Sequence, residues 1–118
     1  MTAQPSDGPV RQVHWNDDAA VVEAAGEIDL NASPDFQQEL LALLDRRPTA
    51  LVVDLSDVPY MDSSGVASLV KVLSRARTAD IRLALAALTP RVRSVLEITR
   101  LDTVFELHDT VQEALAAS

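Results

Sequence analysis

The residues with the clearest chemical potential lie in the segment Asp62-Ser63-Ser64-Gly65. This segment follows the apolar run of residues 50–55 and precedes a stretch with the hydrophobic spacing of a helix. Ligand and reaction sites gather at the carboxyl ends of parallel strands. The amino end of a helix carries free N–H donors and a partial positive charge, which favour an anionic group. The segment is therefore a candidate acceptor of a phosphoryl group.

The same residue types also have a purely structural use. Asp, Ser and Gly are common in turns and helix caps, where they satisfy free backbone groups or permit tight turns. A phosphoserine would add about −1.5 to −2 charges at pH 7, whereas a cap needs no modification. From these residues alone, a plain cap and a phosphorylation site remain open alternatives.

Patterns for other chemistry are missing from the sequence. There is no cysteine, which excludes disulfides, thiolate catalysis and Cys-based zinc sites. His14 and His108 fall in different expected elements without the spacing of metal ligands. Ser63 lies in no Gly-x-Ser-x-Gly motif, and no glycine-rich phosphate loop with a lysine is present. We expect no enzyme activity, no cofactor and no metal, so ATP and magnesium would belong to a partner.

The composition favours one folded domain in 118 residues. The chain is 47% hydrophobic and only 3% aromatic, so its core must consist of aliphatic side chains. A net charge of −8 disfavours binding to nucleic acid or to anionic membranes. Residues 1–9 lack the apolar stretch of a signal peptide, and no apolar run approaches the roughly 18 residues of a membrane span. We expect a cytoplasmic protein with a flexible tail over residues 1–9 and one domain over residues 10–118.

Hydrophobic spacing predicts the element order ββαβαβαβα. Strands are expected at residues 10–15, 19–25, 50–55, 81–87 and 104–107. Helices are expected to begin at Ser33-Pro34, near Val66, at Thr89-Pro90, and at Asp109 or Thr110. Serine is a good N-cap and proline suits the first helical position. Strands that alternate with helices indicate an α/β fold: a mixed, mostly parallel sheet of four to five strands, an antiparallel hairpin at its edge, and about four helices.

Two motifs in this framework resemble the STAS domain of bacterial anti-sigma factor antagonists. Residues 26–29 (Gly-Glu-Ile-Asp) resemble the family's segment after the second strand, and residues 60–65 (Tyr-Met-Asp-Ser-Ser-Gly) resemble its segment after the central apolar strand. Residues 88–92 also resemble the family's junction between a strand and a helix. The resemblance covers roughly residues 10 to 117 in the order of elements. One departure is Ala67, where many relatives have a second glycine.

The resemblance implies a function and a site. In that family the serine directly after the aspartate is phosphorylated by the anti-sigma factor, which is also a serine kinase. Carried over, the phosphorylated residue is Ser63, with Ser64 as the second candidate. The unphosphorylated protein would bind the anti-sigma factor and release the sigma factor, phosphorylation would abolish binding, and a serine phosphatase would reset the switch. The implied partner-binding residues are Asp29, Met61, Asp62, Ser63, Ser64, Gly65 and Val66, together with the exposed face of the following helix.

Two other classes of function remain open alternatives. The chain could be a non-catalytic STAS subunit of a stress-signalling or lipid-transport complex, which the identity of its partner would reveal. It could instead be an enzyme acting alone, which turnover without any partner would reveal. For the favoured class we expect a monomer or weak dimer, with no direct contact to nucleic acid or membrane.

Overall fold

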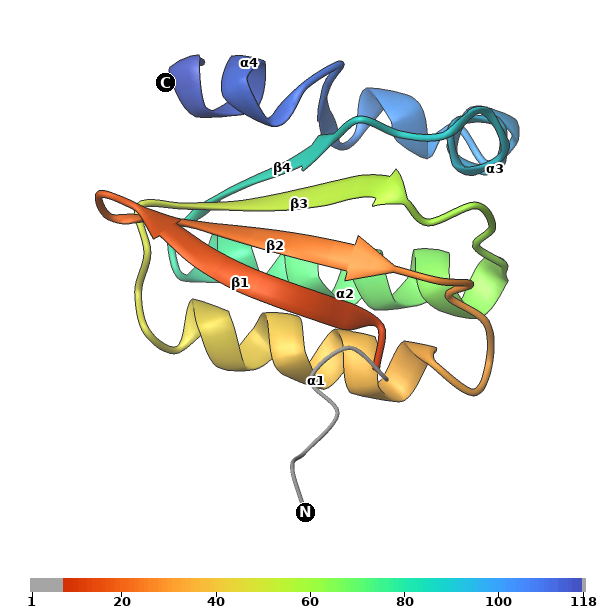
Figure 1. The fold of residues 1–118 in the computed structure, drawn as a ribbon, viewed down its shortest axis with the longest axis horizontal. Helices are drawn as coiled ribbons and strands as arrows, with labels where there is room; N and C mark the ends of the chain where they lie inside the picture. The colour runs from red at the N-terminus through yellow and green to blue at the C-terminus, as the bar shows by residue number, and fades with distance from the viewer. Residues whose placement is uncertain (1–7, 118) are drawn as a thin grey trace.

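A computed structural model describes residues 8–117 and contains a five-stranded sheet with the order β1-β2-β3-β4-β5 (Figure 1). The strands are β1 (Val10–Asn16), β2 (Ala19–Ala25), β3 (Ala50–Asp57), β4 (Arg82–Ala86) and β5 (Glu106–His108). β1 and β2 form an antiparallel hairpin, and β2 to β5 are parallel to one another. The predicted mixed, mostly parallel sheet with an edge hairpin is confirmed.

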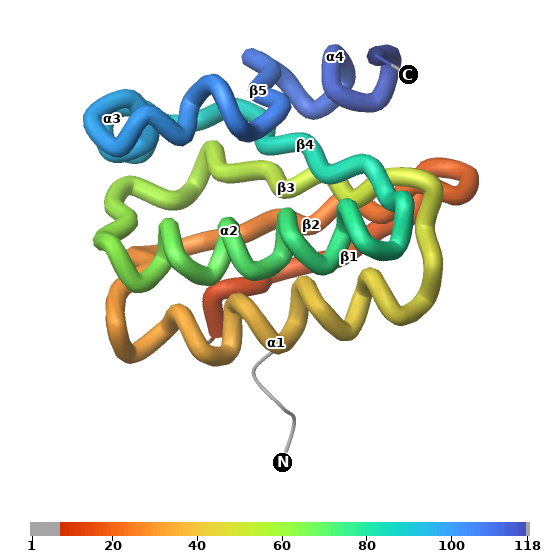
Figure 2. The backbone as a smooth tube through the Cα atoms, turned by 180° about the vertical axis from the view of Figure 1, so that it is seen from behind, coloured from red at the N-terminus to blue at the C-terminus, as the bar shows by residue number. Residues whose placement is uncertain are grey.

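Helices cover the two faces of the sheet unequally (Figures 1 and 2). The helices are α1 (Ser33–Leu44), α2 (Ser63–Thr78), α3 (Pro90–Ile98) and α4 (Val111–Ala116). In both views α1 and α2 lie side by side along one face, and the short α4 lies on the opposite side of the sheet. α3 adds Val92 and Leu96 to the larger core, which also holds the buried residues of α1 and α2.

β3 is the central strand and is buried on both faces. Leu51, Val53 and Leu55 belong to the larger core, whereas Val52 packs in a smaller cluster with Ala114 of α4. Side chains of a strand alternate between its two faces, so a strand covered by helices on both sides is apolar at successive positions. This explains the continuous apolar run, and it places the end of β3 directly before the candidate site.

The start of α1 differs from the prediction. Ala32, not Ser33, occupies the N-cap position, and Ser33 is a buried first residue of the helix. Asp29 satisfies the free amide groups: its carbonyl accepts from the Ser33 N–H at 2.8 Å and its carboxylate from the Ala32 N–H at 3.0 Å. The Ser33 carbonyl in turn accepts from the Ser68 hydroxyl of α2 at 3.2 Å. Ser33 is therefore a contact between two helices instead of a cap.

Three other element boundaries are refined by the structure. α2 begins at Ser63, three residues before the predicted Val66. β5 spans Glu106–His108, later than predicted, because a 3-10 turn over Leu101–Thr103 comes first. Of the two candidate caps for α4, the structure selects Thr110, whose hydroxyl accepts from the Glu113 N–H at 3.0 Å.

Residues 1–7 of the expected N-terminal tail lie outside the described residues. Pro9, expected in the same tail, is buried, and its carbonyl accepts a hydrogen bond from the Ala25 N–H at 2.9 Å. Within residues 8–117, no helix is both long and apolar enough to cross a membrane.

Candidate functional site

The candidate site lies where the β2–α1 and β3–α2 loops pair with each other beyond the carboxyl ends of their strands (Figure 1). The Ile28 N–H donates to the Tyr60 carbonyl at 3.0 Å, and the Asp62 N–H donates to the Ile28 carbonyl at 3.2 Å. Ile28 and Met61 form an isolated parallel bridge, and both side chains are buried. This pairing fixes the backbone before Ser63 relative to the loop that carries Asp29.

Asp62 organises the first turn of α2. Its carboxylate accepts from the Ser64 N–H at 2.9 Å, from the Gly65 N–H at 3.3 Å and from the Ser64 hydroxyl at 2.5 Å. The hydrogen bond from the Ser64 hydroxyl, helped by backbone N–H groups of Gly65, Ser64 and Leu30, lowers the pKa of Asp62 below its usual value. The ionised carboxylate also interacts favourably with the positive end of the helix dipole.

The two adjacent serines have different environments. Ser63 is exposed, and no hydrogen bond within residues 8–117 engages its hydroxyl. Ser64 is half-buried, and its hydroxyl donates to Asp62. Of the two hydroxyls, the Ser63 hydroxyl is therefore the more accessible to an incoming phosphoryl donor.

Asp29 lies in the paired loop before α1, and it caps the start of that helix. Its carboxylate accepts from the backbone N–H groups of Asn31 and Ala32, each at 3.0 Å. Asp29 is half-buried and directly follows Ile28, so its loop borders the loop of Ser63. The carboxylate of Asp29 is thus engaged at the start of α1.

The structure corrects the expected partner-binding surface at three positions. Met61 is only 1% exposed, and Gly65 and Val66 are also buried. A Cβ atom on Gly65 would lie 2.5 Å from the Met61 Cγ and 2.8 Å from the Ile28 carbonyl oxygen. These residues face inward because α2 begins in close contact with the paired loops. They support the turn that carries Ser63, and their side chains are not exposed to a partner.

Comparison with known proteins identifies the family of this site. The family model described as the STAS domain matches residues 11–114. An anti-sigma-B factor antagonist of Listeria monocytogenes is 32% identical over 89 residues, which cover 75% of this chain and 78% of that protein. The chain belongs to the STAS-domain family of anti-sigma factor antagonists.

Solved structures of other proteins have the fold of this STAS domain. An anti-sigma factor antagonist from Mycobacterium paratuberculosis superimposes with a TM-score of 0.83, at 32% identity over 90% of each chain. SpoIIAA, a Bacillus cell fate determinant solved in the phosphorylated form, gives a TM-score of 0.68. The two sequences are 22% identical, and the match covers 88% of this chain and 95% of SpoIIAA. At this identity the likeness shows a shared fold and nothing further.

Two residues of this STAS domain's site were not among the expected site residues, although Ile28 lies in the Gly-Glu-Ile-Asp motif. Ile28 is the buried residue through which the two loops pair, and Leu30 is 74% exposed beside Asp62. The signal for Leu30 was a large apolar residue in a segment expected to be a loop, two residues after Ile28. The α2 surface following Ser63 also exposes Ala67 and Val70.

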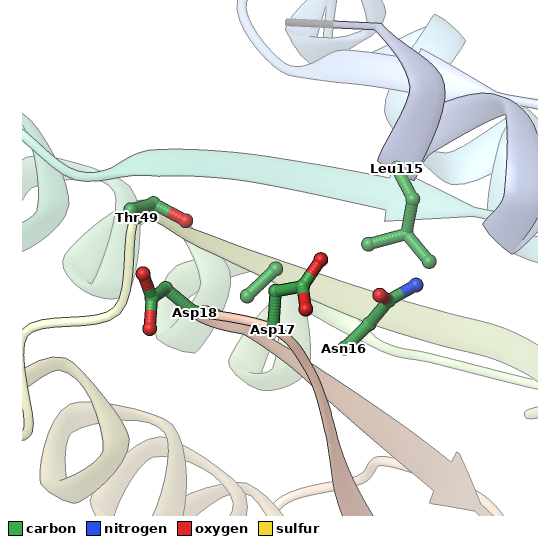
Figure 3. A pocket seen from close by; sticks show the side chains of 6 residues that line it. Asn16, Asp17, Asp18, Thr49 and Leu115 are labelled. Atoms are coloured by element: carbon green, nitrogen blue, oxygen red, sulfur yellow. The ribbon is translucent and has the colours of Figure 1, made fainter.

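A separate hollow lies at the opposite end of this STAS domain's sheet, around the β1–β2 turn (Figure 3). It is lined by Asn16, Asp17, Asp18, Ala19, Thr49 and Leu115. The Asp18 carbonyl accepts from the Thr49 N–H at 2.9 Å, which ties the turn to the start of β3. Because Ser63 follows the other end of β3, this hollow is not part of the candidate site.

Proposed function

We propose that this STAS protein is an anti-sigma factor antagonist whose unphosphorylated form binds a serine-kinase anti-sigma factor and so releases a sigma factor. Phosphorylation at Ser63 abolishes the binding, and a serine phosphatase restores it. In this scheme the protein is a regulator and not an enzyme. It acts in the cytoplasm as a monomer or weak dimer, without direct contact to nucleic acid or membrane.

The observation that carries the proposal is that the hydroxyls of Ser63 and Ser64 differ in exposure and in hydrogen bonding. A kinase needs a hydroxyl that can enter its active site and lose its proton to a catalytic base. Ser63 is exposed, whereas the Ser64 hydroxyl is bonded to Asp62 at 2.5 Å. This difference supports Ser63 as the phosphorylated residue.

Names of similar proteins support the same proposal. The Listeria monocytogenes relative is an anti-sigma-B factor antagonist, and SpoIIAA of the same fold occurs in a phosphorylated form. Neither name specifies the partner of the present chain, so the kinase and the phosphatase belong to the proposal.

The proposed mechanism of release is electrostatic. Asp62 is ionised at neutral pH, and its carboxylate already accepts hydrogen bonds from the Ser64 and Gly65 N–H groups. A phosphate on Ser63 would add about −1.5 to −2 charges beside that carboxylate. When a partner covers the site, the two anions lose water without gaining new donors, which weakens the complex.

The test uses purified kinase-domain anti-sigma factors from the source organism, without ATP when binding is measured and with ATP and magnesium when phosphorylation is measured. The unphosphorylated parent and S63A should bind one of them with similar affinity, and S63A should take up no phosphate. S63D should bind at least about 10-fold more weakly, a difference of about 1.4 kcal/mol. S64A is the matched control and should still be phosphorylated at Ser63, as mapped by mass spectrometry. Equal binding of S63A and S63D would contradict the electrostatic mechanism.

A further inference from the structure

We infer that Leu30 is the apolar residue through which the kinase anti-sigma factor recognises this protein, in the unphosphorylated complex and during phosphorylation alike. The inference rests on the proposed function and adds a specificity-determining residue to it. The matching feature on the partner is an apolar pocket next to its phosphoryl-transfer site.

The first observation is the exposure of Leu30. Its side chain is 74% exposed, whereas Ile28, two residues earlier in the same loop, is fully buried. Leu30 belongs to neither hydrophobic cluster of the described residues. Packing inside the protein therefore does not account for a leucine at this position.

The second observation is that the loop presents Leu30 in a defined position. On its C-terminal side, the Asp29 carboxylate accepts from the Asn31 and Ala32 amide groups, both at 3.0 Å. On its N-terminal side, the Ile28 N–H donates to the Tyr60 carbonyl at 3.0 Å, and the Ile28 carbonyl accepts from the Asp62 N–H at 3.2 Å. An apolar side chain held on an ordered backbone contributes binding free energy with little cost for ordering the loop.

The third observation is the position of Leu30 relative to Ser63. Leu30 lies two residues after Ile28, whose carbonyl accepts from the N–H of Asp62, the residue immediately before Ser63. A kinase whose active site encloses the Ser63 hydroxyl must cover this neighbourhood. Ala67 and Val70 of α2, the helix that begins at Ser63, are also exposed.

The charges around Leu30 favour a different protein over a second copy of this chain. Asp29 and Asp62 flank it, and the whole chain carries a net charge of −8. Two copies that met through this face would bring like charges together in a desolvated contact, which is unfavourable. A different protein need not bring like charges to this face.

The test compares L30A with I98A, using the purified kinase anti-sigma factor that binds S63A. Ile98 is the matched control because it is 81% exposed but lies at the end of α3. L30A should weaken binding and raise the KM for phosphorylation of Ser63 by roughly 10- to 100-fold, as expected for removing a buried leucine contact. Its kcat should stay near the parent value, because Leu30 contributes to binding and not to phosphoryl transfer.

L30M should restore most of the affinity, and I98A should behave like the parent. L30A and I98A should both unfold at the same denaturant midpoint as the parent. The inference is overturned if L30A binds as tightly as the parent while S63D does not, or if L30A and I98A lose affinity equally. If no kinase anti-sigma factor binds the parent protein, the proposed function fails first, and that result is distinct from both others.

Discussion

At the scale of single residues, the site depends on which of two serine hydroxyls is hydrogen-bonded within the protein. Ser63 and Ser64 have the same side chain, but the Ser64 hydroxyl donates a hydrogen bond to Asp62 and the Ser63 hydroxyl is exposed. Asp62 thereby acts as a helix cap and also distinguishes the two serines. Its ionisation state should control the order of the whole first turn of α2.

The pH dependence of Asp62 tests this role. Its pKa is lowered in the folded protein, so the ionised form contributes stability above the unfolded pKa of about 3.9. That contribution is lost as the pH falls through the lower folded pKa. Carbon-13 NMR of the carboxyl group should give a midpoint below about 3.9. In S64A the midpoint should move upward, because the largest cause of the shift is removed. An unchanged midpoint in S64A would contradict the assigned hydrogen bond.

At the scale of elements, the site is the contact of the first turn of α2 with the paired loops. Gly65 lies where the Ile28–Met61 bridge approaches the helix most closely, and no room remains for a Cβ atom. One of the three obstructing atoms is the Ile28 carbonyl oxygen, which cannot rotate away as a side chain can. The orientation of Ser63 therefore depends on a close contact between segments distant in the chain.

G65A should separate these elements. We expect a loss of stability of about 1–3 kcal/mol from overpacking, measured by denaturant unfolding. Phosphorylation of Ser63 should also become slower, because α2 can no longer start in the same place. A67S, on the exposed side of the same helix, is the control and should stay within about 0.5 kcal/mol of the parent. Wild-type stability of G65A would show that the loops can move apart freely.

At the scale of the whole molecule, packing and charge have separate roles. The core is mostly aliphatic, as expected from the composition, but it also includes Phe36 and Phe105. It keeps the loops in place, while a net charge of −8 surrounds the protein with a negative field. Phosphate added to an exposed hydroxyl need not displace any core residue. The switch can therefore change the charge of a surface and leave the fold unchanged.

Salt dependence distinguishes this mechanism from unfolding. S63D should stay within about 1 kcal/mol of the parent in unfolding free energy, because the substitution is at an exposed first-turn position. Its weakened binding to the kinase anti-sigma factor should recover in part between low salt and about 0.5 M salt, since screening reduces repulsion between exposed charges. S63A, which lacks the added charge, provides the reference at each salt concentration. A large drop in the stability of S63D would assign the loss of binding to unfolding instead.

The sequence by itself determined the order of elements, the mixed sheet and the turn that carries Ser63. These features depend on local patterns: apolar runs for β2 and β3, proline at the starts of α1 and α3, and Asp62 before a helical stripe. Local patterns are informative because hydrogen bonds in helices and burial in strands follow the spacing of residues along the chain.

Only the tertiary structure decided which residues of the site are exposed. Ile28 and Met61 are 33 positions apart in the numbering, yet their pairing buries Met61 and Gly65 and leaves Leu30 exposed. The capping of α1 by Asp29 instead of Ser33 depends on the same loop. Burial at a loop is set by neighbours that are distant in sequence, so no local spacing encodes it. The exposed partner surface therefore follows from how the two loops meet.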